Sequence, residues 1–363
     1  MRGAGQAQGR SCPQPHTGTT ERDSWQAGRR RCICTTLIAC AVLVALACAN
    51  LCLGSVEMDV GELVGALMAG PGNTSLHASV IWQIRLPRAV SAALLGGALA
   101  CSGFLLQTFF NNPIASPYVL GISAGAKCAL AAVTIGVIGA GGALASWQVV
   151  GAAFVGALAA TGLVLALSTK IRSMGMLIVA GVMVGYVFNA ATDFLVTFAS
   201  DQNIVNLHNW ALGSFSGATW GQVGVEACVC ALGLAASMVL AKPMAAYQLG
   251  EGYAKSVGVN VRVFRMGLIG VSSLLAACVT AYAGPVGFVG IAVPYLARTA
   301  LGSSKPARVV PACFVMGAAF CLLCDLVARM ALSPTELNLG TVTAVFGAPV
   351  VIALMTRRHR EDR

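Results

Sequence analysis

Charged residues are scarce in this chain of 363 residues, where Asp, Glu, Lys and Arg together make up only 10%. A soluble domain carries roughly a quarter charged residues, so this chain could not cover a surface that faces water. Hydrophobic residues make up 57% of it and recur in apolar runs of about 20 residues. Because these runs are continuous rather than alternating, they predict helices and not a β-barrel. We therefore expect an all-α, polytopic membrane protein.

The sequence also lacks the motifs of an ATPase, a metalloprotein or a His-based enzyme. The nearest approach to a phosphate-binding loop, residues 121–128, lacks the Gly-Lys-Ser/Thr ending, so we do not expect this chain to hydrolyse ATP itself. The histidines are scattered, with no His-Glu-x-x-His motif and no metal-ligand spacing among them: His16, His77, His208 and His359. We expect no catalytic residue, no bound metal and no cofactor in this chain.

The 14 cysteines fall mostly within the apolar runs, where small packing residues are expected. Cys321 and Cys324 have the spacing of a redox pair, but they lie within a predicted span and not in a βαβ unit. The cysteines therefore predict packing and not chemistry.

Ten segments are apolar enough to be predicted spans, of which the eighth is short. They are Ile33–Leu53, Ala89–Thr108, Val119–Ile138, Val149–Ser168, Met176–Ala199, Val223–Ala241, Met266–Ala283, Phe288–Leu301, Val309–Met330 and Val342–Met355. Gly284 and Pro285 precede the eighth span, and interrupted helices at membrane depth usually line a cavity or are buried in protein. We expect residues 33–356 to form a single transmembrane domain, between a disordered basic tail at residues 1–32 and a second basic tail at 357–363.

The basic residues lie in alternate connections between these spans. They occur in both tails and in the loops after the fourth, sixth and eighth spans, which the positive-inside rule assigns to the cytoplasm. An even number of spans puts both termini on that side. The net charge of +10 is therefore read as a signal of orientation, and no nucleic-acid partner is expected.

Three arginines break this rule because they lie at the outer ends of spans: Arg85, Arg88 and Arg329. Arg329 follows Asp325 by four residues, a spacing that favours an ion pair within one helix. The alternative is that the three arginines bind acidic residues of an extracytoplasmic protein.

Residues 249–261 form a short helix candidate of mixed polarity between the sixth and seventh spans. Gly250 and Gly258 are its expected breaks, and Glu251 lies near its start, where the helix dipole favours a negative charge. The segment could lie on the membrane surface, but it lacks a strong basic face, so contact with a protein partner is the favoured interpretation.

Two further sets of residues suggest a lined pathway. The link from Asn111 to Pro117 is either a plain tight connection or part of an inner gate. In the fifth span, Gly181 and Gly185 predict close helix packing, and the polar Asn189 and Asp193 should face a cavity or a partner.

Seven short motifs, in order over roughly residues 84–351, resemble those of one family, the permease subunits of the iron-siderophore, haem and cobalamin class of ABC importers (FecCD-type permeases). The motifs are Arg85-Leu-Pro-Arg88, Asn112-Pro113-Ile114-Ala115, residues 120–126, residues 210–217, Leu249-Gly250-Glu251 with Val257-Gly258-Val259, residues 283–290, and residues 334–337 with 347–349. The chain departs from the family at Tyr295, where His is frequent, and at the charged Lys127 in the third span.

The resemblance implies a ten-helix permease that works as a dimer, with cytoplasmic ATPase subunits that use ATP and Mg and with an extracytoplasmic substrate-binding protein. It places coupling helices at about 245–262, with coupling residues Leu249, Gly250, Glu251, Ala254, Val257, Gly258 and Val259. It gives Arg85, Arg88 and Arg329 a role in docking the binding protein. It assigns the gate and pathway to Asn112, Pro113, Gly121, Ser123, Gly125, Arg172, Ser173, Gly284 and Pro285.

The function expected from the sequence is import of a ferric siderophore through the bacterial cytoplasmic membrane by alternating access. Haem and cobalamin are alternative cargoes within the same class. A more remote alternative is a secondary transporter driven by an ion gradient, for which Asp193 is the main candidate coupling residue.

Overall fold

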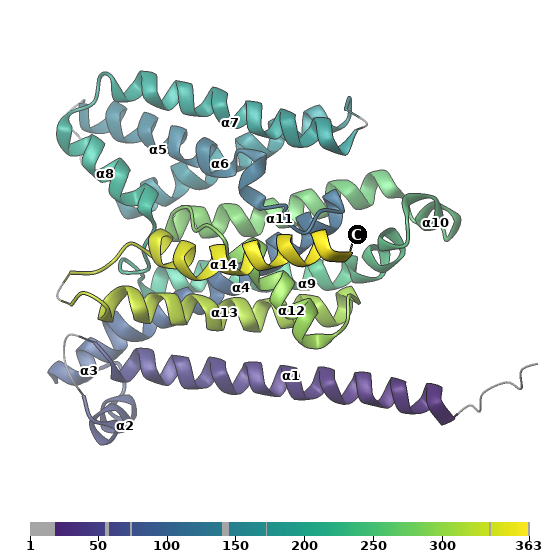
Figure 1. Ribbon diagram of the computed structural model, residues 1–363. Helices are drawn as coiled ribbons and strands as arrows, with labels where there is room; N and C mark the ends of the chain where they lie inside the picture. The colour runs from purple at the N-terminus through teal and green to yellow at the C-terminus, as the bar shows by residue number, and fades with distance from the viewer. Residues whose placement is uncertain are drawn as a thin grey trace, which may run out of the picture.

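Figure 1 shows the computed structural model, which describes residues 19–54, 58–72, 75–139, 145–171, 173–333 and 335–361. Every regular element in these ranges is helical. The helices are α1 (Thr19–Cys52), α2 (Val60–Ala69), α3 (Leu76–Val80), α4 (Leu86–Phe110), α5 (Ile122–Gly139), α6 (Ser146–Ser168), α7 (Met174–Val196), α8 (Asp201–Leu212), α9 (Trp220–Gln248), α10 (Glu251–Ser256), α11 (Val261–Ala283), α12 (Val289–Leu301), α13 (Pro306–Met330) and α14 (Leu339–Glu361). A π-helical turn, Ile81–Arg85, joins α3 to α4, and a 3₁₀ turn, Pro117–Leu120, precedes α5.

Each predicted span coincides with one helix of the structure, in the same order. In the described residues, seven helices are long and apolar enough to cross a membrane, and α5, α12 and α14 contain shorter apolar stretches. The all-α polytopic fold is therefore confirmed. The second span is longer than predicted, because α3, the π turn and α4 form one helical stretch from Leu76 to Phe110.

The predicted tails overlap the first and last helices. The predicted tail ends at residue 32, whereas α1 begins at Thr19. The side chain of Arg31 donates hydrogen bonds to the carbonyl oxygens of Thr299 and Ala300 at the end of α12, at 2.9 and 3.1 Å. At the other terminus, α14 continues through residue 357 to Glu361. Residues 1–18 lie outside the described part of the chain.

Helix α4 lies at the centre of the bundle, in contact with α9, α11, α12 and α13. Glycine allows its closest approaches to these neighbours. A Cβ atom built on Gly96 would lie 2.5 Å from the carbonyl oxygen of Gly317 on α13, and a Cβ on Gly103 would overlap the backbone of Gly290 on α12. Small residues at such crossings give membrane helices the van der Waals contact that lipid cannot replace.

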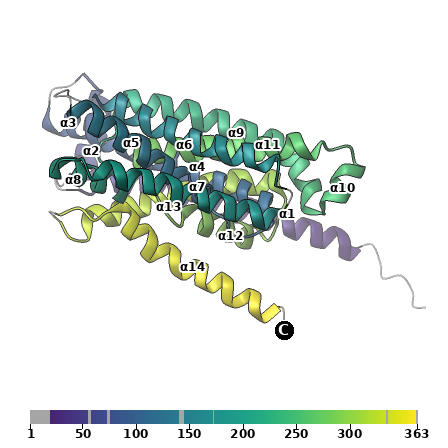
Figure 2. The same cartoon turned by 90° about the horizontal axis from the view of Figure 1, so that it is seen from above.

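The short helices lie at the two ends of the bundle (Figure 1). Helices α2, α3 and α8 lie at one end, which we call the α8 end. Helix α10 lies at the other, which we call the α10 end, together with the start of α1 and the end of α14. Figure 2 shows that α14 diverges from the rest of the bundle as it approaches the α10 end.

Candidate coupling site

Helix α10 is held between two glycine turns. Gly250 has φ of +120° and Gly258 has φ of +86°, both in the region that residues with a Cβ atom rarely adopt. These turns reverse the chain between α9 and α11. The Ala254 side chain is fully buried, and its carbonyl accepts a hydrogen bond from the Val259 nitrogen at 3.0 Å. The predicted coupling segment is thus a compact elbow whose breaks fall at the predicted glycines.

The outer side of this elbow is apolar and exposed. Leu249, Tyr253 and Val257 are exposed and line one groove of about 450 Å³ together with the end of α9. The remaining lining residues are Lys242, Pro243, Ala245, Ala246 and Val259. Exposed apolar side chains gathered at the end of a membrane bundle, beyond the spans, are typical of a protein contact surface.

Glu251 links α10 to its neighbours. Its carboxylate pairs with Lys255 at 2.8 Å and with Arg265 on α11 at 2.7 Å. Arg265 also donates to the hydroxyl of Tyr247 on α9 at 3.2 Å and lies over its ring. The hydrogen bond from Lys255, followed by the charge of Arg265, lowers the pKa of Glu251 from its usual value. The Glu251 carboxylate therefore joins α10 to α11, and Arg265 extends this link to α9. Helix α10 cannot move independently of α11 without breaking the Glu251–Arg265 pair.

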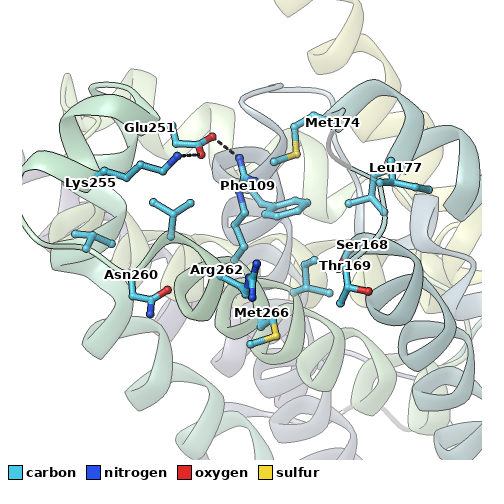
Figure 3. Close-up of a pocket in the computed structure, with 15 residues that line it drawn as sticks. Phe109, Ser168, Thr169, Met174, Leu177, Glu251, Lys255, Asn260, Arg262 and Met266 are labelled. Atoms are coloured by element: carbon cyan, nitrogen blue, oxygen red, sulfur yellow. Dashed lines mark hydrogen bonds and ion pairs between the residues drawn. The ribbon is translucent and has the colours of Figure 1, made fainter.

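A cavity of about 840 Å³ lies on the inner side of the elbow (Figure 3). Its walls come from α10, the start of α11, the ends of α4 and α6, and the start of α7. Glu251, Lys255, Asn260 and Arg262 lie on one side in this view, and Met174, Leu177, Ser168 and Thr169 lie on the other. The remaining lining residues are Phe109, Ile171, Val259, Val261, Arg265, Met266 and Ile269.

The predicted gate residues of α5 lie against α6 and α7. A Cβ atom on Gly121 would lie 3.1 Å from the Gly185 nitrogen, and a Cβ on Gly125 would overlap Gly156. Ser123 lines a groove of about 290 Å³ together with Gly121, Gly181, Gly185 and Asn189. The structure therefore brings together the two glycine-containing segments of the third and fifth spans.

The other predicted gate residues are spread more widely. Asn112 accepts a hydrogen bond from the Ile114 nitrogen at 3.1 Å, which orders the turn around Pro113. Gly284 has φ of +75° and packs against Gly213, next to Pro285. Ser173 is exposed at the start of α7, and Arg172 lies outside the described residues. Tyr118, which is not among the predicted gate residues, links the 3₁₀ turn before α5 to the segment around Pro285, because its hydroxyl accepts a hydrogen bond from the Val286 nitrogen at 3.2 Å.

Arg85 and Arg88 are buried and Arg329 is partly buried, contrary to the expectation of an exposed docking surface. Arg88 pairs with Asp325 and with Glu336, each at 3.0 Å, and Arg329 pairs with Asp325 at 3.3 Å. Arg329 also donates to the side chain of Asn50 on α1 at 2.5 Å. Arg85 donates to the carbonyls of Leu51 and Cys52 at 2.6 and 3.0 Å.

The exposed fractions of Arg85 and Arg88 are only 4% and 7%. The structure thus shows the ion-pair alternative for Asp325 and Arg329. In this arrangement the guanidinium groups already have partners within the chain, which disfavours docking by these arginines. A direct role in docking would require this cluster to open, and it stays a prediction.

Other buried polar residues belong to none of the sites predicted from the sequence. Glu226 on α9 is 1% exposed, although it lies within a predicted span, and a lone acid in an apolar run was the signal that could have revealed it. Gln107 on α4 and Arg298 on α12 form a hydrogen bond across the bundle. Among the described residues, no group of three or more His, Cys, Asp or Glu side chains is arranged to hold a metal ion.

Residues 42–357 match the model of the FecCD transport family. The chain belongs to this family. It is 36% identical over 278 residues to the vitamin B12 import system permease protein BtuC of Klebsiella pneumoniae, a match that covers 76% of this chain and 82% of that protein. It is 33% identical over 326 residues to BtuC of Shigella boydii serotype 18, covering 89% and 95% of the two chains.

Two solved structures have a similar fold to this FecCD-family chain. An ABC transporter described as metal-chelate type, in an inward-facing conformation, matches with a TM-score of 0.78 and 26% identity over 91% of this chain and 99% of that one. PsaBC from Streptococcus pneumoniae, in complex with Fab, shares the fold with a TM-score of 0.51 and 14% identity.

The predicted permease family is therefore confirmed, and this chain is a non-catalytic membrane subunit of an ABC importer. The match favours this function over the ion-coupled alternative, for which Asp193 lies exposed on α7. Membership in the family also implies ATPase partners and a second permease subunit.

Proposed function

We propose that this permease moves a metal chelate across the bacterial cytoplasmic membrane by alternating access, driven by ATPase subunits that contact α10. The observation that carries this proposal is the α10 elbow, which has an exposed apolar outer side and an ion pair to α11 on its inner side. The chain has no phosphate-binding loop of its own, so ATP and Mg would be bound by the partner. We place α10 and both termini in the cytoplasm because basic residues gather at that end.

The path of the motion follows from the contacts of α10. Closure of the ATPase subunits would press on Leu249, Tyr253 and Val257. The Glu251–Arg265 pair would pass this displacement to α11, which packs against α4, α6 and α9. Packed helices tend to move as rigid bodies, so a shift of α11 becomes a rocking of the bundle.

The second subunit would be another copy of this chain. Helix α7 presents exposed apolar side chains along much of its length: Met176, Val179, Val182, Met183, Tyr186 and Val187. Val345, Phe346 and Ile352 are exposed on α14, which diverges from the bundle. Lipid contact alone would also suit such a surface, so the mass of the purified, assembled importer is the test. Two permease copies support the homodimer, and one copy beside a different permease contradicts it.

For the cargo we place cobalamin first, because two proteins that match this chain over most of their length are vitamin B12 import permeases. A ferric siderophore is the second candidate and haem the third, since the class that the motifs resemble includes all three. A binding protein at the α8 end would deliver the cargo.

Uptake of labelled cobalamin, ferric siderophore and haem by a strain lacking only this gene tests the cargo. We expect selective loss of cobalamin uptake, restored by the intact gene. Selective loss of siderophore uptake would replace cobalamin by the second candidate. Loss of none of them, with the partner subunits present, would contradict the proposed cargo class.

A further inference from the structure

The cavity beside α10 lies at the depth where spans begin and end. Phe109 is the penultimate residue of α4, Ser168 is the last residue of α6, and Met174 and Val261 are the first residues of α7 and α11. Beyond the ends of the spans, a bilayer presents its polar headgroups, which extend it from ~30 Å of hydrocarbon to about 40–45 Å in total. The cavity is therefore at headgroup depth at one membrane surface.

The lining of the cavity is amphiphilic. Met174 and Leu177 lie on one side with Ser168 and Thr169, and the basic side chains lie on the other, on α10 and α11 (Figure 3). Apolar lining also comes from Phe109 and, beside the basic residues, from Val259, Val261, Met266 and Ile269. A small soluble anion would leave the apolar wall uncovered. An acidic protein segment would place charged side chains against the apolar wall. A phospholipid, which joins an anionic head to an apolar chain, matches both sides.

The charges around the cavity are unbalanced. Among the described residues, three cations, Lys255, Arg262 and Arg265, line it, with Glu251 as the single acid. Both carboxylate oxygens of Glu251 are already occupied, one by Lys255 and the other by Arg265. Within the described ranges, Arg262 has no ion pair, and the Nε atom of Arg265 is buried without a hydrogen-bond acceptor. Two arginines thus retain donors for a further anion.

We propose that this cavity binds an anionic phospholipid, with its phosphate held by Arg262 and Arg265 and its acyl chain against Met174, Leu177 and Phe109. The planar guanidinium group donates in pairs to phosphate oxygens, and basic pockets between membrane helices on the cytoplasmic side are suited to anionic headgroups. The lipid would fill the space between α7 and the α10 elbow and so steady the elbow against the bundle. This inference rests on the membrane depth of the cavity and is independent of the cargo.

The test uses the importer assembled with its ATPase subunits, in nanodiscs that contain phosphatidylcholine with a small fraction of phosphatidylglycerol. Native mass spectrometry counts the phosphatidylglycerol retained by the wild type, by Arg262→Ala and by Arg308→Ala. Arg308 lies in the first turn of α13 at the same end of the bundle but does not line the cavity. It therefore controls for general attraction between a basic surface and anionic lipid.

We expect the wild type and Arg308→Ala to retain phosphatidylglycerol over phosphatidylcholine. Arg262→Ala should bind it about tenfold more weakly, the loss expected for a hydrogen bond to a charged group. Thermal unfolding of Arg262→Ala in phosphatidylcholine alone, close to that of the wild type, would show that the variant is folded. If it unfolds early, Arg262→Lys provides the comparison, because it keeps the charge and loses the paired donors.

Four results would overturn the proposal. The first is equal retention of the two lipids by the wild type. The second is an equal loss of bound phosphatidylglycerol in Arg262→Ala and Arg308→Ala, which would show only general attraction between a basic surface and anionic lipid. The third is displacement of phosphatidylglycerol by inorganic phosphate at millimolar concentration, which would make the ligand a soluble anion. The fourth is phosphatidylglycerol that binds to the isolated permease but not to the assembled importer, which would assign the cavity to contact with the ATPase.

Discussion

The two ends of the bundle use the same residue types in opposite ways. At the α8 end, Arg88 and Asp325 are buried and pair with each other, and the Asp325 side chain is only 2% exposed. At the α10 end, the Glu251 side chain is 39% exposed and several cations surround a cavity. A buried charge must be paired to be tolerated, whereas an exposed charge remains available to a partner. The comparison indicates that the α8 end is held rigid by its charges and that the α10 end is the surface that other molecules contact.

The largest effect should come from breaking the buried cluster. Asp325→Ala would leave Arg88 and Arg329 without their shared carboxylate, and removing one partner of a buried pair costs about 3–5 kcal/mol. We expect a large fall in the thermal unfolding temperature of the purified permease. Glu336→Gln is the matched control, because the Glu336 side chain is 46% exposed and such pairs contribute about 1 kcal/mol or less. Equal losses in the two variants would contradict the difference in burial.

A charge placed on the outer side of the elbow should disrupt assembly rather than folding. In Val257→Asp, a carboxylate would have to be buried against the ATPase, and we expect about a tenfold fall in ATPase co-purification, equivalent to ~1.4 kcal/mol. Met68→Asp places the same charge on an exposed apolar position of α2 at the opposite end. We expect Met68→Asp to retain the ATPase. If Val257→Asp also retained the ATPase, the ATPase would contact a surface other than the outer side of the elbow.

The glycine turn after α10 provides a smaller test of the geometry of the elbow. Gly258→Ala forces a Cβ atom into a backbone conformation with φ of +86°, at a cost of about 1–2 kcal/mol. Gly252→Ala within α10 meets no atom within 4 Å and should stabilise the helix by about 0.5–1 kcal/mol. Denaturation of the two variants, measured side by side, should give changes of opposite sign in the free energy of unfolding relative to the wild type. Changes of the same sign would mean that the turn is not required.

The smallest effect on stability should come from protonating Glu336 in acid. The hydrogen bond from Arg88 lowers the pKa of Glu336 from its usual 4.5, so the pair stabilises the folded state above that value. The stabilisation is lost as the pH falls through the lower pKa of the folded protein. We expect the unfolding temperature to fall slightly more between pH 5 and pH 3 in the wild type than in Glu336→Gln, with the difference kept small by solvent screening at this exposed carboxylate. Identical pH profiles would show that this pair adds nothing.

The spans could be predicted because each is a continuous apolar run, and the lipid environment requires such a run to be helical. The glycine turns at Gly250 and Gly258 could be predicted for a similar reason, since few other residues fit them. The arginine cluster could not be predicted, because Arg88 contacts Asp325 and Glu336, which lie more than 230 positions later in the chain. The packing of α4 against α13 and against the connection that follows α13 brings these residues together. The cavity and the link from Glu251 to Arg265 depend in the same way on the return of the chain at α10.

The coupling of α10 to α11 through Glu251 and Arg265 is tested most directly by exchanging the two charges. ATP hydrolysis and cargo uptake would be measured together in proteoliposomes that contain the assembled importer, for the wild type, Glu251→Arg, Arg265→Glu and the double exchange. We predict that each single reversal lowers the cargo moved per ATP hydrolysed several-fold, with hydrolysis continuing, and that the double exchange restores most of the ratio. Single reversals that leave the ratio unchanged would contradict a link through this pair, as would a double exchange no better than either single variant.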